Sequence, residues 1–317
     1  MSKADHPGAA RPGNRQAGAR NPITESIGVI GLGIMGSAMS ANLVQAGIRT
    51  VGYDVVRERR EALASVGGRA AASVREVVRA TPVLLTSLPS AEALLDVAHH
   101  ITGQKVAAEV LIETSTLPIA VKEQAHDLLA AQGIVMLDCP LSGTGAQART
   151  KDLAVYASGL KEAYERCIPL FEGFARTHYY LGPFGDGSKM KFLANLLVAI
   201  HNISAAEALV LAQKAGLDLD LAVKVLGDGA GASRMLQVRG PMMAKGDYHD
   251  ATMKVSIWQK DMKIIGEFAR SLDCPVPLFA LSGAIYNAAM AQGFAEQDTA
   301  SVLAVLESLA GVKRPPD

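Results

Sequence analysis

Cysteine is scarce in this chain, because its 317 residues include only three: Cys139, Cys167 and Cys274. Three widely spaced cysteines supply neither a disulfide framework nor a four-ligand zinc site, which excludes a small disulfide-stabilised secreted domain. The seven histidines form no HExxH motif and no other spacing typical of metal binding. The sequence therefore predicts no metal centre and a reducing compartment.

An excess of one charge is also absent, since 31 lysines and arginines balance 31 aspartates and glutamates. This balance gives no global attraction to nucleic acid or to anionic lipid. The most apolar run, residues 192–200, is interrupted by Asn195. It is far shorter than the roughly 20 residues that span a bilayer. We expect a cytoplasmic protein whose partners are neither nucleic acids nor membranes.

The first 24 residues have no apolar segment and are rich in Gly, Pro, Ala and Arg. A secretory signal peptide needs an apolar core, so this composition does not indicate one. Low hydrophobicity favours disorder instead. We expect residues 1–24 to form a disordered leader.

After the leader, short β-branched runs alternate with helix-compatible stretches, beginning with an expected strand at 26–31 and an expected helix at 33–46. This alternation is typical of βαβ units, in which helices cover both faces of a mostly parallel sheet. The other expected elements are strands at 50–53, 83–87, 110–113 and 134–138 and helices at 57–66, 91–100 and 118–131. Two further strands, at 154–158 and 177–180, are expected at one edge of the sheet. We predict an α/β Rossmann-type dinucleotide-binding domain over residues 25–185.

The pattern changes at the turn-rich segment 181–187, after which no convincing strand follows. Residues 188–215 predict one long helix that is apolar on nearly every side, and such a helix must be buried on several of them. Shorter helices are expected near 220–226, 254–272, 276–292 and 299–309. We predict an all-α substrate and oligomerisation domain over residues 186–317, built on the long interdomain helix. Its surplus of apolar surface favours contact with a partner subunit.

A glycine-rich motif, G-x-G-x-x-G, lies directly between the first expected strand and helix. Its glycines permit a tight turn, close approach of a pyrophosphate to the helix N-terminus, and close packing of helix and strand. A glycine turn without a ligand, or a flavin site, are the alternatives. The residues expected to contact the cofactor here are Gly31, Leu32, Gly33, Ile34, Met35 and Gly36.

An acidic residue at the end of the second strand bears on which dinucleotide is bound. Asp54 follows Gly31 by 23 residues and comes directly after Tyr53. A carboxylate there accepts hydrogen bonds from the adenosine ribose and repels a 2′-phosphate. This favours NAD, although the nearby arginines at 57, 59 and 60 leave NADP open.

Two polar side chains lie one turn apart near the start of the long helix. Lys191 and Asn195 project from one face, whereas Lys189 points to roughly the opposite side. A lysine on an apolar helix either has a lowered pKa or finds a partner, and both outcomes suit proton transfer to an alcohol or carbonyl oxygen. It can equally extend its ammonium to the surface, and spacing alone does not decide.

The loop after the strand at 134–138 consists mostly of small residues. Loops at the carboxyl ends of parallel strands are where α/β folds bind ligands. Ser142, with the amides of Gly143 and Thr144, can hold a carboxylate there. A plain turn is the alternative reading of these residues.

The order of these motifs resembles the β-hydroxyacid dehydrogenase family, which includes 3-hydroxyisobutyrate dehydrogenase, tartronate semialdehyde reductase and the glyoxylate/succinic semialdehyde reductases. The resemblance covers residues 26–309. Residues 31–36 resemble the family's GLGxMG turn, and residues 140–143 are similar to its substrate-binding P-V-S-G. Residues 185–191 match G-x-G-x-x-x-K, which implies that Lys191 is the catalytic lysine.

Three shorter elements extend the resemblance. Leu88-Pro89 resembles a Leu-Pro that lies beside the cofactor, and Ser115-Thr116 resembles a Ser-Thr whose threonine contacts the nicotinamide half. Lys260-Asp261-Met262 resembles a late K-D-L element whose lysine reaches the cofactor. The residues that the resemblance adds to the expected site are Tyr53, Leu88, Pro89, Thr116 and Lys260 for the cofactor, and Asn195 and Asp261 for the substrate.

The resemblance implies an NAD(P)-dependent oxidoreductase that interconverts a short 3-hydroxy acid and its semialdehyde, with Lys191 as general acid and base. Three departures from the family pattern concern the substrate: Ala194 replaces an amide, Thr144 replaces a glycine, and Met253 replaces an aromatic residue found in some members. A reductase of another carbonyl or imine substrate, or a dinucleotide-binding module without catalysis, are the alternatives.

Overall fold

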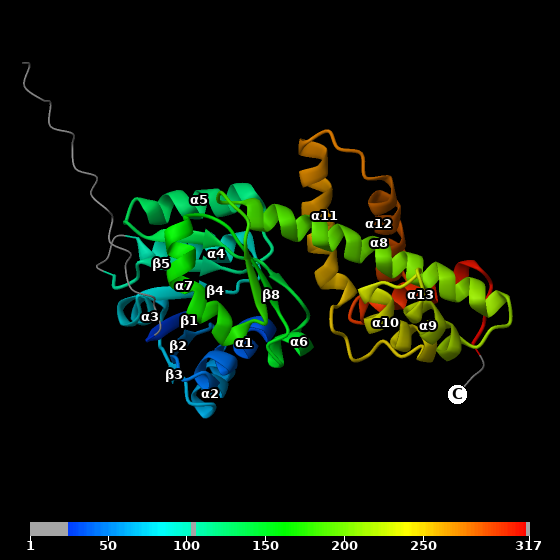
Figure 1. Cartoon of the computed structure of the whole chain (residues 1–317), viewed down its shortest axis with the longest axis horizontal. Coiled ribbons are helices and arrows are strands. Elements are labelled where there is room, and N and C mark those ends of the chain that lie inside the picture. Colours follow the sequence, from blue (N-terminus) through cyan, green and yellow to red (C-terminus); the bar gives the residue numbers. More distant parts are fainter. Residues whose placement is uncertain (1–24, 103–105, 315–317) are drawn as a thin grey trace, which may run out of the picture.

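A parallel sheet forms the core of the first half of the molecule (Figure 1). The computed structural model describes residues 25–102 and 106–314, so the expected leader lies outside the described residues. Six strands follow the order β3-β2-β1-β4-β5-β6, and every pairing between them is parallel. They are β1 (Ser26–Ile30), β2 (Arg49–Tyr53), β3 (Arg69–Ala70), β4 (Val83–Thr86), β5 (Val110–Glu113) and β6 (Val135–Asp138). The predicted Rossmann-type sheet is confirmed.

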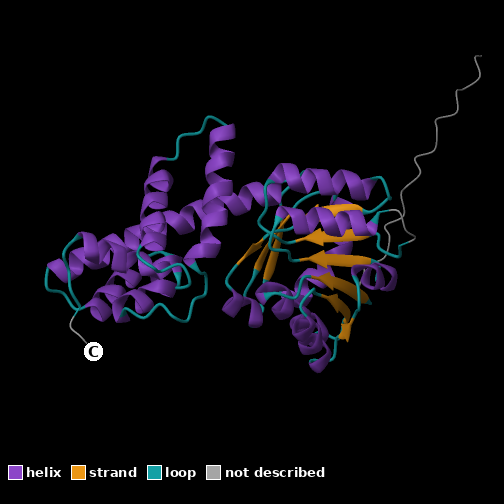
Figure 2. Cartoon of the chain, turned by 180° about the vertical axis from the view of Figure 1, so that it is seen from behind, coloured by secondary structure: helices purple, strands orange, loops and turns teal. Residues whose placement is uncertain are grey.

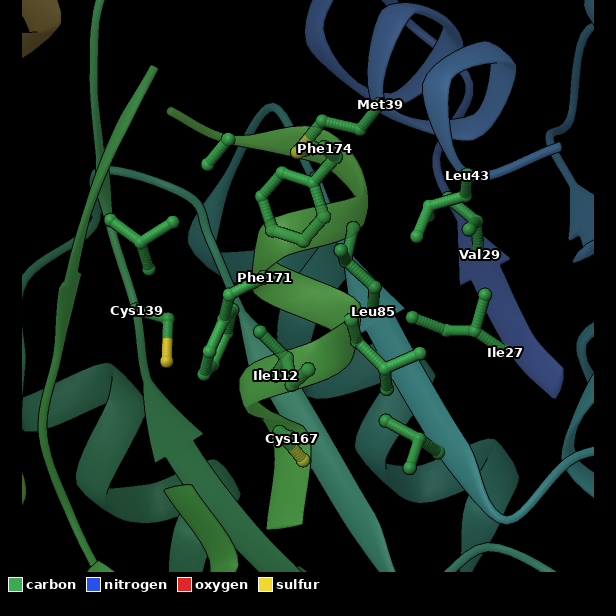
Figure 3. Packing of buried hydrophobic residues seen from close by; sticks show 14 of the residues in the cluster. Ile27, Val29, Met39, Leu43, Leu85, Ile112, Cys139, Cys167, Phe171 and Phe174 are labelled. Carbon is green, nitrogen blue, oxygen red and sulfur yellow. The ribbon is translucent and has the colours of Figure 1, made fainter. Parts of the chain in front are cut away.

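Helices cover both faces of this sheet, as Figure 2 shows. On one face α1 (Ile34–Gln45) and α7 (Lys161–Phe174) pack against the sheet, in a core that includes Ile27 of β1 and Phe171 of α7 (Figure 3). The other face is covered by α3 (Val74–Ala80), α4 (Ala91–Ile101) and α5 (Ile119–Ala130), while α2 (Arg57–Ser65) packs beside β2 and β3. Because β1, β4 and β5 are buried along their whole length, their sequences do not alternate and are apolar except at one end of each, at Ser26, Thr86 and Glu113.

The expected position of the last two strands is wrong. β8 (Ala154–Ala157) and β9 (Thr177–Tyr180) form a separate three-stranded sheet with β7 (Leu141–Ser142), in the order β7-β8-β9. Within the described part of the chain, an isolated bridge between Asp138 and Ser158 joins it to the main sheet. The physical reason lies just after β6, where Pro140 has no amide hydrogen to continue a strand ladder.

The second half of the described chain is helical. α8 (Asp186–Lys214) is 29 residues long and leads from the small sheet across the helical domain (Figure 1). It packs against all the larger helices that follow it. These are α9 (Leu219–Asp228), α10 (Arg234–Lys245), α11 (Val255–Ser271), α12 (Pro277–Ala291) and α13 (Val302–Leu309), the last preceded by a 3₁₀ turn at Thr299–Ser301. We propose that the domain boundary lies between β9 and α8.

By length and composition, α8 is the one helix among the described residues that is able to cross a membrane. The central helix of a folded core meets the same criterion. Here α8 buries residues such as Ala206 and Leu209 among its neighbouring helices. Packing inside the protein therefore explains part of its apolar composition, while side chains such as Leu193 and Leu211 are exposed.

Two helices, α7 and α10, and the short elements β3, β7, α3 and α6 (Gly145–Arg149) were not expected from the sequence. Both longer helices contain a proline, Pro169 in α7 and Pro241 in α10. An interior proline ordinarily signals the end of a helix. Packing overrides that signal here.

Replacing Phe171 with Ala removes a fully buried ring from the core between α7 and the sheet. We expect the free energy of unfolding to fall by about 3–5 kcal/mol, since the vacated space is lined by rigid neighbours. Urea denaturation followed by circular dichroism measures the change. Glu172→Ala, at the exposed neighbouring position, is the control and should change stability by no more than about 0.5 kcal/mol.

Candidate active site

The glycine-rich turn contains glycines that have no room for a side chain and one, Gly33, that faces open space. A Cβ on Gly36 would lie 1.9 Å from the carbonyl oxygen of Gly31, and one on Gly31 would lie 2.2 Å from that of Ser87. The protein's own packing therefore requires glycine at both positions. By contrast, a Cβ on Gly33 would have no atom within 4 Å. α1 begins there without a side-chain cap and without an acidic residue in its first turn, which leaves an open helix N-terminus suited to a phosphate.

Asp54 holds this turn against the end of β2. Its buried carboxylate accepts hydrogen bonds from the backbone N–H of Leu32 at 2.7 Å and of Val56 at 2.8 Å. The Arg59 guanidinium lies 3.4 Å away. A carboxylate can accept about four hydrogen bonds, and the two long ones from Arg59 are the weakest of those made here, so a ribose hydroxyl would bind in their place. The neighbouring Tyr53 also has an arginine partner, because the Arg60 guanidinium lies 5.6 Å from the centre of the Tyr53 ring.

The loops after β4 and β5 are joined to each other at the same edge of the sheet. The N–H of Leu88 donates to the Ser115 hydroxyl at 2.8 Å. The N–H of Ser115 in turn donates to the Glu113 carboxylate at 2.9 Å. Pro89 and Thr116, which follow these two residues, are exposed and half-buried respectively. Since ligands of doubly wound folds bind at the carboxyl ends of the strands, both loops face the expected cofactor region.

Lys191 lies on α8 in a partly buried position and makes no hydrogen bond or ion pair within the described residues. Burial lowers the pKa of its ammonium below the ordinary value of 10.5, and the nearby Lys260 charge lowers it further. The Asp261 carboxylate opposes this effect. The amide of Asn195 donates to Asp261 at 2.8 Å. α8 and α11 thus bring together the lysine, amide and Lys-Asp pair that the sequence places 66 residues apart.

Burial also acts on Asp261. Its desolvation raises the pKa of the carboxyl, while Lys191, Lys260 and the Asn195 hydrogen bond act in the opposite direction. The unpaired lysine and the buried carboxyl therefore share one electrostatic environment. A proton added to or removed from one of them changes the proton affinity of the other.

The loop after β6 was expected to bind a carboxylate through Ser142 and the amides of Gly143 and Thr144. The Ser142 hydroxyl and the Gly143 N–H make no hydrogen bond to other described residues, and Gly143 has a φ of 135° that favours glycine. The amide of Thr144 is different, because it donates to the Gln147 side chain at 3.0 Å while the Thr144 hydroxyl accepts from the Gln147 N–H. This capping box starts α6. A substrate carboxylate would therefore have to replace Gln147 as the partner of the Thr144 amide, and its use there stays a prediction.

The substrate loop and the glycine-rich turn are in contact. A Cβ on Gly145, at the first position of α6, would lie 2.4 Å from the Ile34 side chain. Only a residue without a side chain allows this approach. The loop expected to bind substrate and the turn expected to bind cofactor are consequently held side by side.

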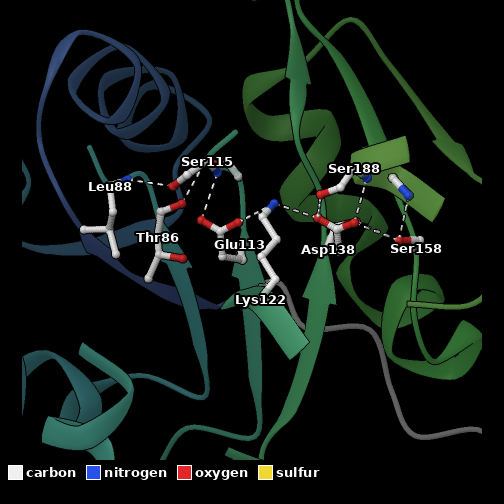
Figure 4. Close-up of polar contacts among 10 residues, drawn as sticks. Thr86, Leu88, Glu113, Ser115, Lys122, Asp138, Ser158 and Ser188 are labelled. Atoms are coloured by element: carbon white, nitrogen blue, oxygen red, sulfur yellow. Dashed lines mark hydrogen bonds and ion pairs between the residues drawn. The ribbon is translucent and has the colours of Figure 1, made fainter. Parts of the chain in front are cut away.

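Sequence reasoning missed a buried group of charges beside these loops. Lys122 of α5 lies between Glu113, at the end of β5, and Asp138, at the end of β6 (Figure 4). The available signal was a lysine on the buried face of α5, in register with Ala125 and Leu129. A charge at a core position indicates buried partners.

Comparison with known proteins gives consistent matches over both domains. Residues 26–182 match the family described as the NAD binding domain of 6-phosphogluconate dehydrogenase, and residues 185–306 match NAD-binding of NADP-dependent 3-hydroxyisobutyrate dehydrogenase. L-threonate dehydrogenase from Cupriavidus necator is 32% identical over 291 residues, covering 90% of this chain and 98% of that protein. NAD-dependent L-serine dehydrogenase from Pseudomonas aeruginosa is 30% identical, covering 90% and 99%. The crystal structure of 3-hydroxyisobutyrate dehydrogenase from Salmonella typhimurium has a TM-score of 0.79 at 29% identity, covering 89% and 99%.

The open space beside Gly33 gives a test of the turn. Gly33→Ala adds a methyl group where the protein has no neighbouring atom, so the melting temperature should be unchanged. Binding of NADH should weaken by about tenfold or more, equivalent to about 1.4 kcal/mol, because the methyl group occupies the approach of the pyrophosphate. Fluorescence titration with NADH measures the affinity. Unchanged affinity in Gly33→Ala would show that the dinucleotide does not approach this turn.

Proposed function

The chain belongs to the β-hydroxyacid dehydrogenase family, and from this premise we propose that it interconverts a short 3-hydroxy acid and its semialdehyde by hydride transfer. It is an NAD(P)-dependent oxidoreductase of that family. The observation that carries the proposal is the unpaired, partly buried Lys191, whose pKa is lowered, beside Asn195 and Asp261. A module that only binds a dinucleotide has no need for a desolvated lysine in this position.

In the proposed mechanism, Lys191 moves the proton of the substrate hydroxyl. Bound nicotinamide supplies the hydride acceptor for oxidation and the hydride donor for reduction. The neutral amine of Lys191 accepts the hydroxyl proton during oxidation, and its ammonium returns a proton to the carbonyl oxygen during reduction. General acid–base catalysis of this kind contributes ~10²–10⁴-fold. Its lowered pKa brings the neutral amine closer to working pH.

Asn195 and the loop after β6 are proposed to hold the substrate carboxylate. One N–H of the Asn195 amide is committed to Asp261, which fixes the orientation of the group. The second N–H then points to the substrate, together with the Ser142 hydroxyl and the Gly143 N–H. Thr144 contributes through its capping of α6 rather than through its amide.

The substrate class rests on chemistry shared by the relatives. Threonate, serine and 3-hydroxyisobutyrate, named for the similar proteins, are short acids with a carboxylate and a hydroxyl group. A 3-hydroxyisobutyrate-like acid carries both the hydroxyl proposed to contact Lys191 and the carboxylate proposed to bind the loop after β6. A spectrophotometric panel of short hydroxy acids with NAD, and of their semialdehydes with NADH, tests this class. Absence of turnover across the panel would favour a module that only binds the dinucleotide.

We also propose that the enzyme acts in the cytoplasm as a homodimer or homotetramer. Exposed leucines on α8 and α12, among them Leu197 and Leu278, form apolar surface on the helical domain. Such surface is typical of subunit contacts. Light scattering should give a mass at least twice that of one chain, and a monomer at micromolar concentration would contradict the proposal.

Replacement of Lys191 by Ala should lower kcat by ~10²–10⁴-fold, because the group that moves the proton is lost. NADH affinity should be nearly unchanged, since the dinucleotide turn lies on the other domain. Steady-state kinetics and NADH titration measure the two effects separately. Turnover within about tenfold of wild type would show that Lys191 is not the acid–base group.

The pH dependence of the reaction should follow the lowered pKa of Lys191. Oxidation requires the neutral amine, so kcat/KM should rise with pH through a pKa below 10.5, and reduction should fall through the same pKa. Asp261→Asn removes a negative charge that stabilises the ammonium, so it should move this transition to lower pH. An unchanged profile in Asp261→Asn would contradict the assignment.

The buried Asp54 favours NAD, whose adenosine ribose lacks the 2′-phosphate. We expect NADH to bind at least about tenfold more tightly than NADPH, since a second negative charge beside this carboxylate is repelled. Titration of both reduced dinucleotides measures the ratio. Tighter NADPH binding would instead assign the α2 arginines at 57, 59 and 60 to the 2′-phosphate.

A further inference from the structure

Three ionisable side chains are fully buried at the carboxyl edge of the main sheet: Glu113, Lys122 and Asp138. Glu113 and Asp138 lie directly opposite each other in the register of β5 and β6. Two carboxylates so close in a desolvated place repel each other strongly. Lys122 separates them, with its Nζ atom 2.6 Å from Glu113 Oε2 and 2.7 Å from Asp138 Oδ1 (Figure 4).

The balance of forces on Lys122 keeps it charged. Burial alone lowers the pKa of its ammonium, but attraction to Asp138 and Glu113 outweighs burial and raises the pKa above its ordinary value. The side chain is therefore an ammonium throughout the physiological pH range. It cannot reach solvent or substrate, so it takes no part in proton transfer.

One end of this group of charges leads to the loops expected beside the cofactor. Glu113 Oε1 accepts the N–H of Ser115, whose hydroxyl accepts the N–H of Leu88. Both loops thus take their position from the Glu113 carboxylate. Because Lys122 holds the other oxygen of that carboxylate, it fixes the orientation of the whole group.

The other end leads to the start of α8. Asp138 Oδ2 accepts the N–H of Ser188 at 2.7 Å, and Asp138 Oδ1 accepts its hydroxyl at 2.8 Å. The N–H of Gly187 donates to the Ser158 hydroxyl at 2.9 Å. α8 has no side-chain cap of its own, since the residue before it is Gly185. A carboxylate from β6 therefore supplies its cap, one helical turn before Lys191.

Tight packing makes this contact rigid. A Cβ on Gly187 would lie 2.3 Å from the carbonyl oxygen of Tyr156 and 2.6 Å from that of Asp138. The first turn of α8 thus rests directly on the backbone of β6 and β8. A displacement of Asp138 is transmitted to the helix, since no flexible side chain lies between them.

We propose that Lys122 is a positioning residue for hydride transfer, which fixes the start of α8, and so Lys191, relative to the nicotinamide-side loops at Leu88 and Ser115. This rests on the proposed role of Lys191 as the acid–base group. A buried ion group is often no more stabilising than apolar residues of the same size, so stability alone does not explain it. Geometry does, because a misplacement of about 1 Å at the reacting atoms costs about 100-fold in rate.

Ser188→Ala is the mildest test, because it removes one hydroxyl contact with Asp138 and leaves the backbone contact in place. We expect kcat to fall by about tenfold, while the NADH dissociation constant stays within about threefold. Tyr286→Phe is the matched control. It removes the buried hydroxyl of Tyr286 on α12, which accepts a hydrogen bond from Asn202 of α8. This contact lies in the interior of the helical domain, so kcat should be unchanged.

Lys122→Met tests the charge itself by leaving two carboxylates without their cation. We expect a larger fall in kcat, about 100-fold, if the variant folds. Addition of Glu113→Gln removes one of the two repelling charges while its amide oxygen still accepts from Ser115. The double variant should recover part of kcat, which a loss of packing alone would not allow.

A spectroscopic measurement follows the same geometry without turnover. Trp258 is the only tryptophan in the chain, is buried on α11 and lies two residues before Lys260. Energy transfer from Trp258 to bound NADH reports how the helical domain sits over the dinucleotide. It should change in Ser188→Ala and stay constant in Glu172→Ala; Tyr286→Phe is unsuitable for this measurement because the Tyr286 ring lies 6.1 Å from that of Trp258.

The outcomes separate the two proposals. Unchanged kcat and energy transfer in Ser188→Ala, in an enzyme that Lys191→Ala inactivates, would overturn the positioning role alone. Loss of stability in Lys122→Met with kcat unchanged would do the same. Absence of turnover in the wild-type enzyme, or full turnover in Lys191→Ala, would overturn the proposed function and the role of Lys122 with it. If Lys122→Met does not fold, Ser188→Ala decides.

Discussion

The attachment of α8 to the carboxyl edge of the parallel sheet is the constraint on which the site depends. The helix carries Lys191 and Asn195, yet its first turn is capped by Asp138, a residue of β6. The sheet in turn determines where the loops after β4 and β5 lie, through Glu113. Two domains with separate hydrophobic cores therefore share one rigid polar contact at the place where the chemistry is proposed.

Two lysines in this region show how partners decide the state of a desolvated ammonium. Lys122 is fully buried, but two carboxylates touch it, and its pKa is raised. Lys191 is less enclosed, but no carboxylate is in contact with it, and its pKa is lowered. Contact distance thus outweighs depth of burial. The first lysine is suited to holding structure, and the second is suited to exchanging a proton.

Much of the fold followed from pattern, because parallel strands buried on both faces are continuously apolar and are separated by amphipathic helices. The face shared by Lys191 and Asn195 followed from helical spacing alone. The small second sheet did not, since the effect of Pro140 on strand pairing depends on where the chain goes next. α7 and α10 were missed because Pro169 and Pro241 contradict a helix locally.

The polar contacts of the site were harder to foresee, because they depend on strand register. The sequence places Glu113 and Asp138 at the ends of two expected strands, 25 residues apart. Only the parallel register sets them opposite each other and creates the need for a cation. The partner of the Thr144 amide was hard to foresee for a related reason, since Gln147 lies on a helix of only five residues. Short elements leave too weak a pattern in the sequence.

A division of roles within the site follows from these contacts. Residues proposed to determine the reaction type are held by the sheet and α8, through glycines that admit no side chain and through the buried charges. The departures at Ala194, Thr144 and Met253 lie outside that set. Met253 packs against the helical core and donates its N–H to Asp298, while Thr144 caps α6. We propose that substitution at such positions changes the substrate without moving Lys191, so that one scaffold keeps its hydride chemistry.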